Sequence, residues 1–186
     1  MEEYLNIYDE NNVSVGEVKE RKLVHQLGLW HREIAIWIMN EKNEVLIQKR
    51  AATKKLEPNK WALCAGHISS NETMIEAALR EAEEEVGLKK LTPADLKLLE
   101  IQKVTSQKDT IKNNHYKYCY ILKTNYKEDE FVIQNEELSA VKYISLEKLE
   151  NLSEDEKKEF TSLFSKKEFK ETLEKLKNKL EELKED

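Results

Sequence analysis

Hydrophobic and polar positions divide this chain into short strand-like segments around one amphipathic helix. Segments rich in β-branched and aromatic residues, bounded by polar turns, favour strands. We expect strands in these segments: Glu3–Tyr8, Val13–Val18, Glu33–Met39, Glu44–Arg50, Trp61–Ala65, Leu98–Ser106, Tyr116–Leu122, Glu130–Gln134 and Val141–Ile144. The first two flank a polar turn and predict an N-terminal β-hairpin. The polar stretch Gln107–Asn114 is expected to connect two of the later strands.

The central helix is the best-defined element of this pattern. Thr73 and Glu76 have the spacing of a capping box, in which each side chain accepts from the other residue's backbone amide. Apolar residues then recur at helical spacing, at Met74, Ile75, Ala78, Leu79, Ala82 and Val86. Gly87 follows and suits a helix end in the left-handed region. Strands before and after one helix predict an α/β sandwich with a mixed sheet.

The C-terminal part of the chain has a different pattern. From Ser153 onward charged residues dominate and glycine and proline are absent. Apolar residues spaced 4, 3, 4 and 3 apart predict an amphipathic helix with a narrow seam, formed by Phe169, Leu173, Leu176, Leu180 and Leu183. The seam either packs on its own domain, or mediates homodimerisation, or binds a partner helix. We therefore expect a main domain over residues 1–152 and a helical extension over 153–186.

Composition excludes several classes of protein. A length of 186 residues fits one domain. The 31 basic and 37 acidic residues give a net charge of −6, which argues against a nucleic-acid-binding surface. The longest apolar run, Ile34–Met39, is too short to cross a membrane. The acidic N-terminus does not read as a signal peptide. We expect a cytoplasmic location, with Cys64 and Cys119 as buried, reduced thiols.

Acidic residues and glycines recur at fixed spacing around the central helix. Gly66 is followed after five residues by Glu72, and after seven more by the run Arg80–Leu88, which reads REAEEEVGL. Two of only 4 glycines in the chain, Gly66 and Gly87, stand in this pattern. Glu81, Glu84 and Glu85 fall on nearly one helical face because residues three and four apart are surface neighbours. Such a carboxylate cluster suits Mg²⁺ or Mn²⁺, which prefer oxygen ligands.

This pattern resembles the Nudix box in full. The resemblance implies an α/β/α sandwich and a hydrolase that cleaves a small-molecule diphosphate, such as a nucleoside diphosphate derivative, with Mg²⁺ or Mn²⁺. It implies that Glu81, Glu84 and Glu85 bind the metal and that Ala65 offers a carbonyl oxygen. Glu84 and Glu85 are also candidate catalytic residues. A further acidic residue often comes from a later loop in this family, and Glu137 or its neighbour Glu136 is the candidate base or added ligand.

Other residues are candidates for holding the substrate or the glutamates. Arg50 ends a strand before a lysine-rich loop and is expected to contact diphosphate oxygens. Trp61 either stacks on a base or belongs to the core. Arg80 is interpreted as a strut that orients the glutamates, with a phosphate contact as the alternative. Glu72 is interpreted as an organiser of its loop.

Residues 1–150 also resemble a Nudix branch related to type I isopentenyl diphosphate isomerase. His67 matches the histidine after the box glycine, His31 matches one at the entry to a strand, and His25 lies near a third. The three histidines therefore form a candidate zinc or manganese site. The isomerase cysteine is replaced by Ala65, and Cys64 is one residue early, so its side chain is expected to point away from the site. An isomerase-like enzyme and a non-catalytic diphosphate-binding module remain alternatives to a hydrolase.

Overall fold

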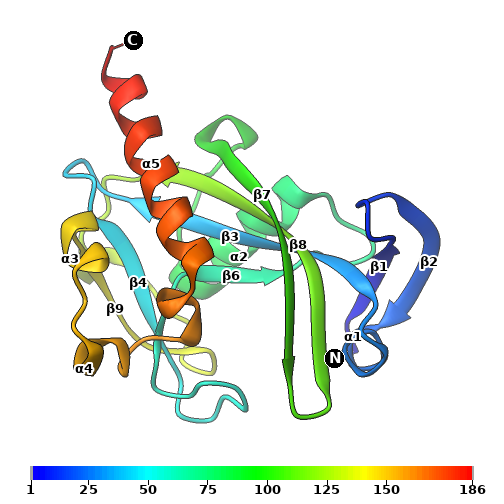
Figure 1. Ribbon diagram of the computed structural model, residues 1–186. Helices are drawn as coiled ribbons and strands as arrows, with labels where there is room; N and C mark the ends of the chain where they lie inside the picture. Colours follow the sequence, from blue (N-terminus) through cyan, green and yellow to red (C-terminus); the bar gives the residue numbers. More distant parts are fainter. Residues whose placement is uncertain (1, 186) are drawn as a thin grey trace.

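The computed structural model describes residues 2–185, without the side chains of residues 108 and 183–185. It contains one sheet of nine strands. The strands are β1 (Tyr4–Tyr8), β2 (Ser14–Glu20), β3 (Trp30–Met39), β4 (Val45–Arg50), β5 (Trp61–Ala62), β6 (Cys64–His67), β7 (Leu96–Lys108), β8 (Ile111–Lys123) and β9 (Leu138–Ile144). The helices are α1 (Arg21–Leu27), α2 (Met74–Val86), α3 (Leu146–Glu150), α4 (Glu154–Lys157) and α5 (Lys167–Glu185). Figure 1 shows their arrangement.

Strand β3 is the centre of the sheet. It runs parallel to β8 along its whole length and antiparallel to β1, β4 and β6. The sheet is therefore mixed, as the sequence predicts. The short strand β6 pairs Glu33 with His67 and Ile36 with Cys64. This pairing brings the segment before the glutamate helix next to the histidine-containing start of β3.

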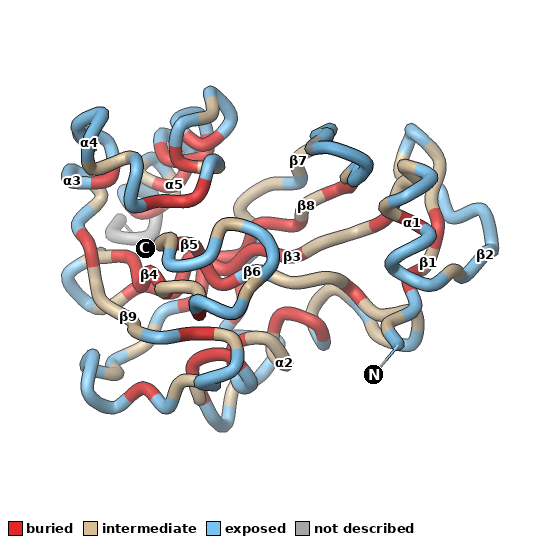
Figure 2. Tube along the Cα trace, turned by 90° about the horizontal axis from the view of Figure 1, so that it is seen from below, coloured by how far each residue is buried: buried red, intermediate tan, exposed pale blue. Residues whose placement is uncertain are grey.

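Helices cover both faces of the sheet and form three layers (Figure 2). One hydrophobic core lies between the sheet and α2 and includes Ile34, Ile36 and Ala82. A second core lies between the opposite face and the C-terminal helices and includes Trp37 and Leu176. The alternation of Ile36 and Trp37 between these cores follows from the two-residue period of a strand. The predicted α/β/α sandwich is confirmed.

The C-terminal helix α5 packs on its own domain. The four described residues of its apolar seam are buried against the sheet: Phe169, Leu173, Leu176 and Leu180. The fifth, Leu183, lies outside the described side chains. The ring of Phe169 stacks on Trp37 with a centroid separation of 5.6 Å. The described part of the seam is thus occupied by its own sheet and is not free to pair with a second copy.

The central helix has the predicted ends. The Thr73 hydroxyl accepts a hydrogen bond from the Glu76 amide, and the Glu76 carboxylate accepts one from the Thr73 amide. Gly87 adopts φ 72° and its amide donates to the carbonyls of Ala82 and Glu83. A side chain at Gly87 would also collide with Val132, because a Cβ there would lie 2.8 Å from the Val132 carbonyl oxygen.

Two strand predictions are corrected by the structure. Glu130–Gln134 is not a strand, because the amides of Val132 and Gln134 donate to the carbonyls of Val86 and Glu85 at the end of α2. The polar stretch Gln107–Asn114 is not a loop, because β7 and β8 continue through it to a tight turn at Asp109. The polar composition of this stretch suggested a loop. A pair of strands with both faces exposed to solvent does not need alternating apolar residues, so it can be polar throughout.

Candidate active site

The three glutamates of the motif lie together on α2, where Arg80 links two of them. Its guanidinium nitrogen Nη1 lies 2.8 Å from Glu81 Oε1 and 3.2 Å from Glu84 Oε2. Two further nitrogens of the same guanidinium bind the Glu72 carboxylate, at 3.0 Å and 2.7 Å. Glu72 in turn accepts from the Ser69 amide at 2.8 Å. Arg80 is therefore a strut between loop and helix, and Glu72 organises the loop.

Strand β6 sets the position of two of these carboxylates. Glu81 lies against Gly66, where a Cβ atom would sit 2.1 Å from Glu81 Oε1. Glu85 lies beside the thiol of Cys64, one step earlier on the same strand face. The two residues from Cys64 to Gly66 cover about 6.6 Å along the strand, and the four residues from Glu81 to Glu85 cover about 6 Å along the helix. These spacings match, so both glutamates can contact β6 at once. Glycine is needed at position 66 because the Glu81 carboxylate fills the space of a side chain.

The prediction for Cys64 needs a correction. Cys64 does lie on the opposite strand face from Ala65 and His67, as the register requires. The glutamate helix, however, covers that opposite face. The thiol therefore points at Glu85 and not away from the carboxylates. The prediction was wrong because it treated the glutamates and the histidines as one site on one face.

Glu85 is the most enclosed of the three glutamates. Its residue is 9% exposed, and its Oε2 accepts a hydrogen bond from Gln48 Nε2 at 2.7 Å. Burial raises the pKa of Glu85 to about 7, although the hydrogen bond from Gln48 opposes the shift. Burial also raises the pKa of Glu81, while the neighbouring Arg80 lowers it. Glu84 is exposed, so the cluster extends from the core of the protein to its surface.

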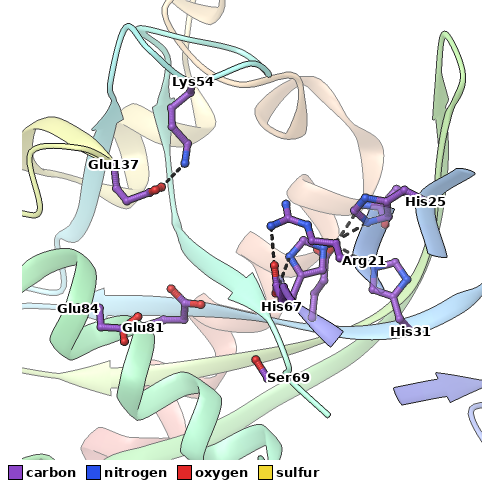
Figure 3. Close-up of polar contacts among 12 residues, drawn as sticks. Arg21, His25, His31, Lys54, His67, Ser69, Glu81, Glu84 and Glu137 are labelled. Carbon is purple, nitrogen blue, oxygen red and sulfur yellow. Dashed lines mark hydrogen bonds and ion pairs between the residues drawn. The ribbon is translucent and has the colours of Figure 1, made fainter. Parts of the chain in front are cut away.

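Glu137 lies across from the glutamate helix. Its carboxylate forms an ion pair with Lys54, and Figure 3 shows this pair facing Glu81 and Glu84. The backbone carbonyl of Glu137 accepts from the Ala51 amide at 2.8 Å, which fixes the loop against the end of β4. Its neighbour Glu136 is exposed. Of the two acidic candidates in this loop, the structure thus brings Glu137 toward the cluster.

The predicted substrate residues are held by other parts of the chain. The Arg50 guanidinium donates to the Leu56 carbonyl, with distances of 3.1 Å from Nε and 3.0 Å from Nη2. Trp61 packs at the edge of the core under the C-terminal helices, with Lys142 Nζ 4.3 Å from its ring centroid. A substrate contact by either residue stays a prediction, as does a metal contact by the Ala65 carbonyl.

The three predicted histidines converge from three elements. His25 lies in the last turn of α1, His31 is the second residue of β3, and His67 ends β6. His67 Nε2 lies 3.3 Å from His25 Nε2. The His31 ring centroid lies 5.2 Å from that of His25 and 5.4 Å from that of His67. Figure 3 shows these rings as a group separate from the labelled glutamates.

Glu33 completes this cluster and was missed by the sequence analysis. One ligand atom from each of His25, His31, Glu33 and His67 lies within 4.8 Å of the others. Glu33 Oε1 is 3.5 Å from His31 Nε2 and 3.5 Å from His67 Nε2. Its other oxygen is 3.2 Å from Nε2 of the buried His115. A lone glutamate in an apolar strand was the available signal, because a charge there needs a partner.

The charge state of this cluster suits metal binding. Burial lowers the pKa of His25 to about 4 and the pKa of His67 well below its ordinary value. Burial alone would raise the pKa of Glu33, but His115 and the other histidines hold it well below its ordinary value. His31 Nε2 is buried without a hydrogen-bond partner in the described part of the chain. Neutral imidazoles around a carboxylate are the donor set that zinc and manganese sites use.

The comparison with known families decides the assignment. Residues 29–164 match the model of the NUDIX domain. The chain belongs to the Nudix family. The resemblance seen in the sequence is therefore confirmed, and membership in this family supports the prediction of a Nudix-type enzyme.

Two relatives illustrate the range of this family. The chain is 32% identical over 155 residues to Nudix hydrolase 3 of Arabidopsis thaliana, a match that covers 81% of this chain. It spans only 20% of the length of that plant protein. It is 29% identical over 171 residues to isopentenyl-diphosphate Delta-isomerase 2 of Photorhabdus laumondii, with 89% of this chain and 90% of the isomerase covered.

A solved structure supports the fold of this Nudix protein. The crystal structure of DR0079 from Deinococcus radiodurans superposes with a TM-score of 0.62 at 20% identity. The match covers 80% of this chain and 86% of the other. Among the described residues, no helix is long and apolar enough to cross a membrane.

Proposed function

We propose that this protein hydrolyses the phosphoanhydride bond of a nucleoside diphosphate derivative or a similar small molecule, with Mg²⁺ or Mn²⁺ as cofactor. The observation that carries the proposal is the gathering of Glu81, Glu84 and Glu85 on α2, with Glu81 and Glu85 against β6 and Glu84 joined to Glu81 through Arg80. Membership in the Nudix family supports the reaction type.

The donor set fits a hard divalent cation. All three side chains offer carboxylate oxygens, which Mg²⁺ and Mn²⁺ prefer. Glu81 and Glu84 already share the positive charge of Arg80 Nη1, so their carboxylates converge without a large rearrangement. When bound, divalent ions would supply positive charge to the diphosphate oxygens and lower the cost of the developing negative charge. The Ala65 carbonyl is the proposed fourth protein donor.

Glu137 is the proposed general base. As a carboxylate beside Lys54 it can accept the proton of the attacking water. The oxygen of that water then bonds to phosphorus, and the bridging phosphorus–oxygen bond breaks. The ion pair with Lys54 orients the Glu137 carboxylate, and Arg50 and Trp61 remain the proposed contacts to the diphosphate and the base.

A panel assay tests this proposal. Nucleotides, nucleotide sugars and prenyl diphosphates are incubated with Mg²⁺ or Mn²⁺, and the products are separated by liquid chromatography. Glu84→Gln is the test variant, because Glu84 is exposed and its loss leaves the core intact. Glu83→Gln, an exposed glutamate of the same helix outside the proposed ligand set, is the matched control.

We expect cleavage of at least one diphosphate, a loss of about a hundredfold or more in Glu84→Gln, and ordinary activity in Glu83→Gln. Cleavage of no compound with either metal would contradict the proposal, as would equal activity of the two variants. Tight binding of a diphosphate without turnover would instead favour a non-catalytic binding module.

An isopentenyl-diphosphate isomerase is the second candidate. The match to the Photorhabdus isomerase covers nearly all of both chains. Against it, Ala65 stands where the resemblance calls for the catalytic cysteine, and Cys64 faces Glu85 on the other side of the strand. Isomerisation of a prenyl diphosphate without cleavage of its anhydride bond in the same panel would favour this candidate.

We also propose that the histidine cluster is a second metal site, for zinc or manganese, with Glu33 added to the three predicted histidines. Supporting this, His25, His31 and His67 approach one another as closely as ligands of one ion would, and burial keeps the first and last neutral. Metal analysis of protein purified without chelator should find about one tightly bound transition metal per chain. Its absence would remove this second site.

A further inference from the structure

The buried carboxylate of Glu85 is held by side chains from two strands of the sheet, β4 and β6. Gln48 on β4 donates from Nε2 to Glu85 Oε2 at 2.7 Å. Cys64 on β6 places its thiol beside the same carboxylate. Gln48 is 4% exposed and Cys64 is 2% exposed. These residues lie outside the helical motif that supplies the carboxylates.

The amide of Gln48 is costly where it lies. A primary amide removed from water without full hydrogen bonding destabilises the folded state relative to an apolar side chain. Its nearest neighbour on the same strand face, Leu46, belongs to the apolar core over α2. An apolar side chain at position 48 would fill this place at lower cost. Packing alone does not explain an amide at this position, whereas the hydrogen bond to Glu85 does.

We propose that Gln48 and Cys64 are positioning residues that fix the Glu85 carboxylate for metal binding. The inference rests on the proposed function, in which Glu85 is a metal ligand. Gln48 holds one carboxylate oxygen, which restricts rotation about the last side-chain bond of Glu85. The remaining oxygen is then directed toward Glu81 and Glu84. Hydrogen bonds of this kind orient metal ligands and strengthen their binding.

A second feature of Gln48 supports this role. Its Oε1 atom is buried and has no hydrogen-bond partner among the described residues. A buried amide oxygen is rarely left without a donor. Next to a carboxylate that binds a hydrated cation, this oxygen is placed to accept a hydrogen bond from a water of that cation. One amide would thus serve both the protein ligand and the hydration of the ion.

The test measures Mg²⁺ affinity directly, by isothermal titration of the full chain. Mg²⁺ is used because it prefers oxygen ligands, so the histidine cluster contributes little. Gln48→Met keeps the size of the side chain and removes the amide. Gln102→Met is the matched control, since Gln102 also donates from Nε2 to a glutamate, Glu100, at 2.9 Å, but lies on β7 against α5. Glu85→Gln serves as the reference for loss of the ligand itself.

We expect Gln48→Met to weaken Mg²⁺ binding about tenfold to a hundredfold, with Gln102→Met like the wild type. Unchanged affinity in Gln48→Met, with weaker binding in Glu85→Gln, would overturn the inference and leave the proposed function standing. Unchanged affinity in Glu85→Gln would overturn the inference as well. Weaker binding in Gln48→Met, together with no hydrolysis of any compound by the wild type, would support the inference and contradict the proposed function.

Cys64 is tested by its conservative replacement. Cys64→Ser keeps a donor beside Glu85, whereas Cys64→Ala removes it with little change in volume. A positioning role predicts weaker Mg²⁺ binding in Cys64→Ala and recovery in Cys64→Ser. Equal affinities in the two variants would show that Cys64 only fills space and would restrict the positioning role to Gln48.

Discussion

The glutamate cluster and the histidine cluster lie on opposite faces of strand β6. On β6, Cys64 and Gly66 face α2 and its carboxylates, whereas His67 points to the other face. On β3, Glu33 pairs with His67 and joins the histidines. Strand β6 therefore separates a site of three carboxylates from a site of three imidazoles and the Glu33 carboxylate. Adjacent residues of one strand serve different chemistry because successive side chains alternate in direction.

The two clusters also differ in how the metal-free protein avoids repulsion between their side chains. Carboxylates on one helix face repel one another, so Glu81 and Glu84 depend on the charge of Arg80 in the metal-free protein. The imidazoles of His25 and His67 are neutral because burial lowers their pKa values. The first cluster is thus poised to exchange one cation for another. The second needs only an ion that prefers nitrogen donors.

The largest effect is expected for a substitution that disturbs the glutamate cluster and leaves the histidine cluster unchanged. Gly66→Ala would place a Cβ atom 2.1 Å from Glu81 Oε1, which is too close for two unbonded atoms, so the Glu81 side chain must move. We expect diphosphate hydrolysis to fall about a hundredfold, since a displacement of about 1 Å in a catalytic group has that effect. Zinc content should stay that of the wild type. Steady-state kinetics and metal analysis provide the two readouts.

Gly16→Ala is the control for a glycine substitution outside the cluster: a Cβ there meets nothing within 4 Å, although the φ of 74° strains the backbone of β2. Its hydrolysis rate should equal that of the wild type. Full activity in Gly66→Ala would show that hydrolysis does not need Glu81 in its present position. Contact with β6 would then not be what positions the catalytic carboxylates.

The next effect acts on the histidines alone. His67→Ala removes the residue whose Nε2 contacts His25 and Glu33. Loss of a ligand should weaken zinc binding at least tenfold, the lower limit for disturbing even an outer contact of a metal site. Mg²⁺ affinity at the glutamates should not change. Competition with a chromophoric zinc chelator measures the first quantity and isothermal titration the second.

Glu84→Gln should give the reverse pattern, with weaker Mg²⁺ binding and ordinary zinc binding. If either variant weakened the binding of Mg²⁺ and of zinc equally, the two clusters would act as one site. Their separation in the structure would then not correspond to two metal sites.

The smallest expected effect concerns the start of the glutamate helix. Thr73→Ala removes the hydroxyl that caps α2 two turns before Glu81. We expect the free energy of unfolding to fall by about 1 kcal/mol, the usual value of such a cap. Mg²⁺ and zinc affinities should stay unchanged, because β6 and not the helix start positions the carboxylates. Urea denaturation measures the stability, and a parallel fall in Mg²⁺ affinity would contradict this explanation.

Local signals in the sequence predicted the parts of the fold and site that depend on neighbours along the chain. The capping box at Thr73, the turn at Gly87 and the shared face of the glutamates follow from helical spacing alone. The mixed sandwich follows from strands on both sides of the helix. The seam of α5 was predicted too, although its spacing left open what the seam packs against.

Contacts between distant segments were not predictable in the same way. Gln48 meets Glu85 only because β4 passes over α2, and Glu33 meets His67 only through the pairing of β3 with β6. The direction of Cys64 was expected from the strand period, but the position of α2 relative to that strand was not. The segment Glu130–Gln134 resembles a strand, yet its amides bind the end of α2. Each of these outcomes depends on which elements become neighbours in space.

Anomalous diffraction from crystals soaked in Mn²⁺ together with a non-hydrolysable diphosphate analogue tests the central claim most directly. The account predicts a manganese peak in contact with the carboxylates of Glu81, Glu84 and Glu85 and with phosphoryl oxygens of the analogue. A map with manganese only at the histidines, and with Arg80 still bound to Glu81 and Glu84, would contradict it.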